Sequence, residues 1–390
     1  MVCRVGKRRL VTLSQGVGPW AATKAALKTY LAANDGSLNP HSQSVMPSSP
    51  TIRTATSLSS PDNDLTAAYR YSLASGVFRF EGGGDKGFGA GTYRQFPVAR
   101  IAASGANLGD GTAGVVWQTR IVANSTKVGF RLLGGLKAFR FIVDGRYVSL
   151  TGTLTATSSG TNYIVLDFGA KASREIIVEN QEASAFDGVY VASGDTVSLP
   201  SASSYRLLVL GDSFIASTGA TIASDGLASV AADYLVIRDR WASGSGGTGY
   251  VATNAGASYA LPTRVAEDVQ RFAALGSADI IVVAIGLNDI GSAGVQTAAA
   301  STFDLIRANA PRALVFVVGP WDQNAPSAPV SNYAACKSAI QAAMSGRGGF
   351  WFLDPQGVSY TKYDTVHPND SGHTTLGQWL STQIRTAIAA

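Results

Sequence analysis

The sequence predicts a three-layer α/β/α sandwich with a parallel sheet, preceded by an all-β domain of the sandwich or jelly-roll kind. After residue 205, apolar runs of strand length alternate with helical stretches of about 10–15 residues, which is typical of a parallel sheet covered on both faces. Between residues 66 and 200, short stretches with a period of two are separated by turns, which favours antiparallel pairing. A length of 390 residues also favours two domains.

Residues 1–65 are predicted to form an N-terminal arm or leader segment. Within them, the alanine-rich stretch Trp20–Ala33 predicts a short helix. Residues 36–65 are rich in Ser, Pro, Thr and Asn, a composition typical of an extended linker or a poorly ordered arm. The apolar patch that follows the basic N-terminus, Leu10–Leu13, is shorter than the apolar core of a cleavable signal peptide.

The predicted all-β domain, residues 66–200, contains one marked hairpin. Phe141–Val143 and Arg146–Val148 flank Asp144-Gly145, and Asp-Gly suits a two-residue turn that needs positive φ. The small and polar stretch 193–205 is the predicted domain boundary. The other candidate strands are 77–80, 117–122, 163–168, 175–179 and 189–191.

The predicted α/β domain, residues 205–390, alternates strands and helices. The carboxyl ends of parallel strands meet at one edge, where open α/β sheets bind ligands. The candidate strands are 207–211, 234–238, 279–285, 313–319 and 350–354. The candidate helices are 217–232, 263–275, 296–309, 331–345 and 371–388.

Composition argues against several classes of function. The net charge of +5 is small for this length, and no dense basic run occurs beyond Lys7–Arg9, so nucleic-acid binding has little support. No apolar stretch approaches the ~20 residues of a membrane helix. Cys3 and Cys336 are too few for a disulfide framework or a structural zinc site. Gly82–Gly87 lacks the Gly-Lys-Ser/Thr ending of a phosphate loop, which predicts an ordinary loop.

A candidate nucleophile follows the first strand of the second domain. The apolar run Leu207–Leu210 predicts a strand buried on both faces, and it stops at Gly211-Asp212-Ser213. Such a turn presents Ser213 at the carboxyl edge of the sheet. A serine nucleophile also needs a general base, an orienting acid and an oxyanion hole.

The chain offers three histidines as candidate bases. His41 lies in the Pro- and Ser-rich arm, which is a poor place to hold a catalytic group still. His367 follows the last predicted strand and therefore returns to the edge that carries Ser213. Asp364 lies three residues earlier, so it can fold back in a turn and hold the other nitrogen of the imidazole.

His373 is expected to have a structural role. It follows Asp370-Ser371-Gly372, which is typical of a helix start with Asp370 as the N-cap. A metal site formed by Asp364, His367, Asp370 and His373 is the alternative, and only the residue types and their spacing support it.

Two predicted loops offer donors for an oxyanion. The strand 279–285 ends in Gly286-Leu287-Asn288-Asp289, which places the amide of Asn288 at the same edge as the serine. The predicted strand 234–238 is followed by a glycine-rich stretch, 241–250, which can bring a backbone N–H close to a ligand. Trp321, after the fourth strand, either lines an acyl or sugar site or packs in the core.

Over about residues 205–390, the chain resembles the SGNH hydrolase superfamily, also called GDSL-type esterases. The resemblance lies in Gly211-Asp212-Ser213, Gly286-Leu287-Asn288-Asp289 and Asp364-Thr365-Val366-His367, which occur in this order. It implies that Ser213 is the nucleophile, His367 the general base and then acid, and Asp364 the orienting carboxylate. It also implies an oxyanion hole formed by the Ser213 N–H, the Asn288 amide and the N–H of a glycine.

The glycine of the oxyanion hole is the open position of this resemblance. Gly246 matches best, because of its distance after Ser213 and the Gly-Thr that follows it, and Gly244, Gly247 and Gly249 are the alternatives. Phe214 also departs from the family pattern, which usually has a leucine-type residue there.

The all-β domain looks like the N-terminal jelly roll of two-domain carbohydrate esterases, where it either binds sugar or only packs against the esterase. The expected function is therefore a serine esterase that hydrolyses short-chain acyl esters, O-acetyl esters above all, on a small molecule or polysaccharide, without metal or organic cofactor. One alternative is a lipid esterase or thioesterase of the same superfamily. The other is a glycan-binding surface or virion attachment protein with a vestigial hydrolase domain, against which the intact set Ser213, Asn288, Asp364 and His367 argues.

Overall fold

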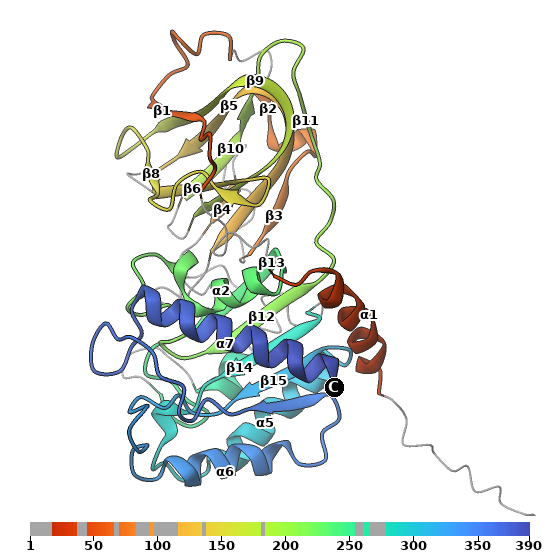
Figure 1. Cartoon of the computed structure of the whole chain (residues 1–390), viewed down its shortest axis with the longest axis vertical. Coiled ribbons are helices and arrows are strands. Elements are labelled where there is room, and N and C mark those ends of the chain that lie inside the picture. Colours follow the sequence, from red (N-terminus) through yellow and green to blue (C-terminus); the bar gives the residue numbers. More distant parts are fainter. Residues whose placement is uncertain are drawn as a thin grey trace, which may run out of the picture.

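The computed structural model describes residues 18–36, 45–65, 70–82, 94–96, 116–134, 138–180, 184–253, 260–265 and 278–390. An antiparallel all-β domain precedes a domain with a parallel sheet, as the sequence predicts, and Figure 1 shows the first stacked above the second. Cys3, Lys7–Arg9, His41, Gly83–Gly87 and the predicted helical residues 266–275 lie outside the described residues. No helix in the described ranges is long and apolar enough to cross a membrane.

Two long strands form the centre of the all-β domain. β5 (Trp117–Leu133) and β9 (Thr161–Asn180) pair antiparallel from end to end, with one irregularity between Ser125 and Lys127. The sequence predicts shorter strands here, and the pairing with β5 is in fact interrupted at Phe168–Lys171, but β9 continues through this stretch as one strand. The neighbouring strands β6 (Ala138–Val143) and β10 (Ser184–Tyr190) pair with β9 and β5, respectively.

The predicted hairpin is confirmed. β6 and β7 (Arg146–Tyr147) pair through Val143 and Arg146, and the turn residues Asp144 and Gly145 have φ values of 49° and 82°. The short strands around this framework are β2 (Arg70–Tyr71), β3 (Arg79–Glu81), β4 (Arg94–Phe96), β8 (Thr153–Leu154) and β11 (Thr196–Ser198).

Two parts of the predicted N-terminal arm belong to the folded domains. The predicted helix is confirmed as α1 (Trp20–Ala33), and its Leu27 and Leu31 are buried in the core of the α/β domain. Contrary to the prediction of a linker, β1 (Thr51–Ala55) pairs with β9. Its sequence is largely polar because it is exposed on one side, so it lacks the apolar signal of a central strand.

The second domain contains a parallel sheet in the order β13-β12-β14-β15-β16. The strands are β12 (Arg206–Gly211), β13 (Asp239–Gly244), β14 (Ile280–Ala284), β15 (Leu314–Val318) and β16 (Phe350–Leu353). Successive side chains of a strand point to opposite faces. Leu207 and Val209 of β12 accordingly pack in one core cluster, and Leu208 and Leu210 pack in another.

Helices cover both faces of this sheet (Figure 1). The helices α2 (Leu227–Tyr234) and α7 (Asp370–Ala389) lie on the face of the first cluster, together with α1. The helices α5 (Val295–Asn309) and α6 (Tyr333–Met344) lie on the other face.

The prediction of a strand at 234–238 was wrong. The helix α2 extends to Tyr234, Val236 has a positive φ of 58°, and the strand begins at Asp239. The strand begins with the charged pair Asp239-Arg240, which a sequence pattern assigns to the surface. Both side chains are in fact buried in ion pairs, and the sequence does not reveal these partners. The helix predicted from residue 217 also begins only at Leu227.

A buried ionic cluster joins the two domains. Glu179 of β9 accepts hydrogen bonds from Arg140 of β6 at 3.0 Å and from Arg240 of β13 at 3.1 Å. Arg240 also pairs with Asp233 of α2, and Arg140 donates to Asp225 at 2.8 Å. The cluster therefore ties the all-β domain to the strand and the helix that flank β12.

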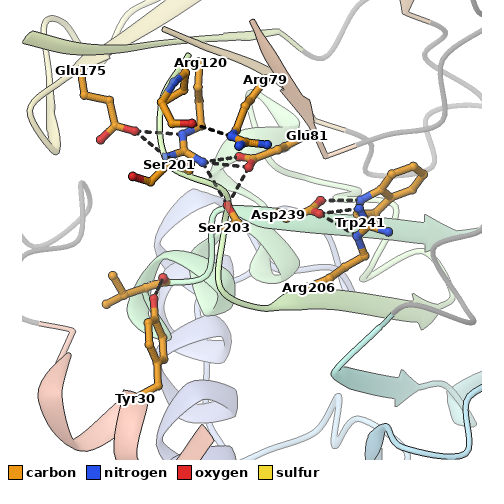
Figure 2. A network of polar contacts seen from close by, with 12 residues as sticks. Tyr30, Arg79, Glu81, Arg120, Glu175, Ser201, Ser203, Arg206, Asp239 and Trp241 are labelled. Atoms are coloured by element: carbon orange, nitrogen blue, oxygen red, sulfur yellow. Dashed lines mark hydrogen bonds and ion pairs between the residues drawn. The ribbon is translucent and has the colours of Figure 1, made fainter. Parts of the chain in front are cut away.

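A second network surrounds the segment that connects the domains (Figure 2). Arg120 of β5 donates to Glu81 of β3 at 2.8 Å and to Ser203 of the connecting segment at 3.0 Å, and Arg79 donates to the Pro200 carbonyl at 2.6 Å. These bonds hold the predicted boundary stretch against the all-β domain.

Candidate active site

The carboxyl edge of the parallel sheet carries a pocket with a volume of about 680 Å³. It lies where β12, β13 and β14 end and where the chain enters α7. Its lining residues are Ser213, Thr218, Gly246, Gly247, Leu287, Asn288, Ile290, Gln323, Val330, Ser331, Val366 and His367. A pocket therefore lies at the edge of the sheet where the strand pattern predicts ligand binding.

Three of the predicted site residues form a hydrogen-bonded chain at this pocket. The Ser213 Oγ lies 2.9 Å from Nε2 of His367, and Nδ1 of the same ring lies 2.8 Å from Oδ2 of Asp364. In this arrangement Nδ1 donates to the carboxylate, which leaves Nε2 free to accept the serine proton. The chain can thus activate a hydroxyl group.

The turn from Asp364 to His367 is fixed by its own hydrogen bonds. Oδ1 of Asp364 accepts from the N–H groups of Val366 and His367, both at 2.7 Å. Together with the bond from the imidazole, which is the largest cause, these donors lower the pKa of Asp364 to about 2. The Tyr360 hydroxyl donates to the Val366 carbonyl at 2.8 Å. The carboxylate therefore stays charged while it orients the ring.

The turn that carries Ser213 is tight. A methyl group on Gly211 would lie 2.1 Å from Cγ1 of Ile215 and 2.6 Å from the Ala284 carbonyl oxygen, so no larger residue fits there. Asp212 is fully buried and accepts from the Phe214 N–H at 3.0 Å. Burial raises the pKa of Asp212 to about 7.

Phe214 and Trp321 pack behind the serine. Their rings stack at 5.5 Å with an interplanar angle of 10°, and the Phe214 ring lies 5.9 Å from the His367 ring. Trp321 is only 1% exposed, so it packs in the core. This is one of the two roles that the sequence left open, the other being to line an acyl or sugar site. The phenylalanine at this position thus lies beside the imidazole, with its ring tilted by 47°.

Asn288 reaches the pocket from the short helix η4 (Leu287–Asp289). Its Nδ2 donates to the Thr248 carbonyl at 2.9 Å. The next residue, Asp289, is buried and accepts from the N–H groups of Tyr250, Val251 and Ala252, at 2.7, 2.9 and 2.9 Å. The loop after β14 thus holds the loop after β13.

The structure separates the four candidate glycines. Gly246 and Gly247 line the pocket, and a methyl group on Gly246 would lie 3.9 Å from Cβ of Ser213. Gly244 is the last residue of β13 and is packed against the Ala216 backbone. Gly249 is packed against the Asp289 carboxylate.

One buried residue that organises the site was missed by the sequence analysis. Arg264 is 0% exposed and donates to the carbonyls of Gly211 and Ser243 at 2.9 and 2.7 Å and to the Thr248 hydroxyl at 2.7 Å. It therefore joins the ends of β12 and β13 to the glycine-rich loop. A lone arginine in a predicted helix gives no signal of such a role.

His373 lies beside the site without joining the serine. It is buried, its Nδ1 accepts from the Leu227 N–H at 3.2 Å, and its Nε2 donates to the Thr218 carbonyl at 3.0 Å. Burial lowers the pKa of His373 to about 4, so the ring is neutral at pH 7. The structural role expected for this residue agrees with these contacts.

The predicted N-cap of α7 was wrong by one residue. Asn369 is the N-cap and accepts from the Gly372 N–H at 3.0 Å, whereas Asp370 accepts from the Thr221 N–H and hydroxyl, both at 2.7 Å. Asn and Asp serve equally well as caps, so composition alone could not separate them. Within the described parts of the chain, no group of three or more His, Cys, Asp or Glu side chains could hold a metal ion.

Residues 209–375 match the model of the GDSL-like Lipase/Acylhydrolase family. This segment contains the whole predicted set from Ser213 to His367. A search of curated protein sequences finds no match.

Solved structures show the same fold over most of the chain. A salicylyl-acyltransferase from a tetracycline biosynthetic pathway has a TM-score of 0.60 and 14% identity, covering 82% of this chain and 98% of its own. A family two carbohydrate esterase from Clostridium thermocellum, in complex with cellohexaose, has a TM-score of 0.58 and 15% identity, covering 80% and 99%. An acetyl xylan esterase from the rumen bacterium Butyrivibrio proteoclasticus has a TM-score of 0.57 and 13% identity, covering 82% and 99%.

Proposed function

We propose that this chain removes short acyl groups, acetyl above all, from a carbohydrate. Residues 209–375 match the model of the GDSL-like Lipase/Acylhydrolase family, and a domain of this kind belongs to an ester-hydrolysing enzyme. One observation carries the proposal. The hydrogen-bonded chain from Ser213 through His367 to Asp364 opens directly into the pocket at the sheet edge.

In the first half of the proposed reaction, the Ser213 oxygen attacks the ester carbonyl carbon. His367 takes the serine proton at Nε2, while Asp364 holds Nδ1–H and stabilises the imidazolium that forms. The negative charge that develops on the carbonyl oxygen is stabilised by the N–H of Ser213, the N–H of Gly246 and the amide of Asn288. Asn288 is suited to this role because an amide nitrogen carries two hydrogens, and the Thr248 carbonyl takes only one.

In the second half, the tetrahedral intermediate collapses and the C–O bond to the sugar breaks. His367 gives its proton to the departing alcohol, which leaves an acyl group on Ser213. A water molecule then attacks the acyl carbon, with His367 accepting its proton. Release of the carboxylic acid restores the serine hydroxyl.

The substrate proposal rests on the pocket and on the named relatives. Leu287, Ile290, Val330 and Val366 offer apolar contacts to an acyl group, and Gln323 and Ser331 offer hydrogen bonds to an alcohol. The similar structures include enzymes named as carbohydrate esterases and one named as an acetyl xylan esterase. The hydrogen-bonding side chains and the named relatives favour an acetylated sugar over a lipid.

The decisive experiment is the hydrolysis of an aryl acetate by the Ser213→Ala variant. We expect activity to fall to background while the circular dichroism spectrum stays that of the wild type. Ser371→Ala, an exposed serine at the start of α7, is the matched control and should keep full activity. Activity retained in the Ser213→Ala variant would overturn the proposal.

A panel of substrates tests the acyl group and the alcohol. Aryl acetate, butyrate and octanoate should be hydrolysed at rates that fall with chain length, and acetylated xylo-oligosaccharides should release acetate. Faster turnover of the octanoate would instead assign the chain to the lipid esterases.

A further inference from the structure

We propose that a second pocket, beside the candidate active site, binds the neutral sugar chain that carries the ester. This inference rests on the proposed function and extends it from an acetylated sugar to an acetylated oligosaccharide. The pocket has a volume of about 490 Å³, which lies within the range of ligand sites in proteins. It is formed by the loop after η4, the first turn of α5 and the exposed side of α6.

The second pocket borders on the active-site pocket. Ile290 and Ser331 line the first pocket, and the residues that follow them, Gly291 and Asn332, line the second. Gly291 and Asn332 also face each other, because a methyl group on Gly291 would lie 3.7 Å from Nδ2 of Asn332. A ligand that reaches from Ser213 past this pair enters the second pocket. The two pockets therefore meet at this pair, and we infer that a sugar chain crosses it.

The lining of the second pocket suits a neutral sugar. Ser292, Gln296, Thr297 and Asn332 supply hydroxyl and amide groups, and such groups both donate to and accept from sugar hydroxyls. Among the residues that the structure describes, those that line this pocket carry no charge, so an anionic chain would find no counter-ion there. The remaining lining residues are mostly glycine and alanine, which leave room for a ring.

Asn332 stands out at the junction of the two pockets. Its φ is 64°, a conformation that costs a non-glycine residue energy, and although it begins α6 its side chain caps no N–H group of the helix. Its amide is exposed and does not cap the helix, so it is accessible to a ligand. Cys336, another lining residue, has a structural partner, because its thiol donates to the Gly286 carbonyl at 3.5 Å. Asn332 is therefore the residue we assign to sugar binding.

The experiment compares one variant on two substrates. Asn332→Gly removes the amide and keeps the positive φ without strain. We expect KM for a partly acetylated xylohexaose to rise about tenfold, as the loss of one or two hydrogen bonds predicts. The kcat/KM for an aryl acetate, which is too short to reach the second pocket, should stay at the wild-type value.

A second pair of variants controls for general damage. Gln296→Ala removes another amide from the pocket and should also raise KM for the hexaose, whereas Gln378→Ala, on the exposed side of α7, should not. An equal change on both substrates for Asn332→Gly, or no change on the hexaose, would overturn the proposal.

A binding measurement separates this inference from the proposed function. In the Ser213→Ala background, calorimetry with cellohexaose and xylohexaose reports binding without turnover. We expect binding of at least one hexaose and its loss when Asn332→Gly is added. Binding of neither, in a protein whose wild type hydrolyses aryl acetate, would overturn the second pocket and leave the esterase proposal standing.

Discussion

The two places where this chain brings charged side chains together differ in burial. At the domain interface, the side chains of Glu179, Arg140, Arg240 and Asp233 are at most 4% exposed. At the candidate active site, the side chain of His367 is 23% exposed and that of Asp364 is 43% exposed. The interface charges have several partners each, whereas among the described residues the imidazole of His367 forms hydrogen bonds with one carboxylate and one hydroxyl.

This difference separates stability from chemistry. Removing a charge from water is costly, so a buried ion is tolerated only when its partners remain in place. Burial alone would raise the pKa of Glu179, but Arg140 and Arg240 outweigh it and lower the pKa below its usual range. The interface therefore keeps one protonation state, whereas in the proposed reaction the partly exposed His367 accepts a proton and returns it.

The largest effect is expected from His367→Ala. Without a base, Ser213 stays protonated, and we expect kcat for an aryl acetate to fall by about 10⁴-fold or more. The midpoint of urea unfolding should stay near the wild-type value, because an exposed ion pair contributes little to stability. Steady-state kinetics and unfolding curves on the same preparation check both parts. A large loss of stability would show that the ion pair of the active site stabilises the fold, contrary to the contrast with the interface.

The second effect concerns Glu179→Gln, which leaves two buried arginines without their shared carboxylate. We expect the free energy of unfolding to fall by about 3–5 kcal/mol, the usual cost of breaking a buried ion pair. Asp304→Asn is the matched control, since its carboxylate is 68% exposed and pairs with Arg347 on the surface. The control should lose less than about 1 kcal/mol.

The kinetics of Glu179→Gln sharpen the contrast. The kcat of the folded fraction should remain close to wild type, because the cluster does not touch the pocket. Equal losses of stability in Glu179→Gln and Asp304→Asn would contradict the view that burial makes the interface ions important.

The third effect is expected from Asn288→Ala. The amide would stabilise charge only in the transition state, so kcat should fall about 10²–10³-fold with little change in KM. Hydrolysis of an aryl acetate measures both constants. An unchanged kcat would remove Asn288 from the oxyanion hole, and a changed KM with unchanged kcat would assign it to substrate binding instead.

The sequence predicts the residues whose local pattern is itself the signal. Ser213 lies in the turn that follows a run of apolar residues. Asp364 lies three residues before His367, so one turn brings these two side chains together. Buried parallel strands are continuous apolar runs, which made β12, β14, β15 and β16 predictable to within a residue or two.

The parts that sequence analysis missed depend on partners far away in the chain. Arg240 could not be assigned to a strand, because only Glu179 of the other domain and Asp233 make its burial possible. Arg264 is likewise understood only from the three groups to which it donates, which are the carbonyls at the ends of β12 and β13 and a hydroxyl in the loop after β13. Charged residues in a core are predicted as surface by any local rule.

The smallest effect is a pH dependence that arises from His373, a buried group beside the candidate active site. Burial lowers the pKa of this histidine from 6.5 to about 4, so the unfolded chain binds its proton first as the pH falls. The contribution of His373 to stability should accordingly fall by about 3 kcal/mol in total between about pH 6.5 and pH 4 and level off below, while Asp212, whose pKa burial raises to about 7, contributes in the opposite direction over the same range. Above pH 6.5, both states are neutral at this residue and the contribution is constant.

Protonation of His373 has a specific structural cost. The added proton would sit on Nδ1, which now accepts from the Leu227 N–H, so two donors would face each other. Urea unfolding from pH 7 to pH 4 measures the effect, with His373→Gln as the comparison because glutamine does not titrate. The variant should lose stability at pH 7, and because Asp212 titrates alike in both proteins, the difference between wild type and variant should shrink toward pH 4. Parallel pH profiles for the two proteins would mean that His373 is not held neutral, and that the segment from Ser213 to Leu227 is stabilised in another way.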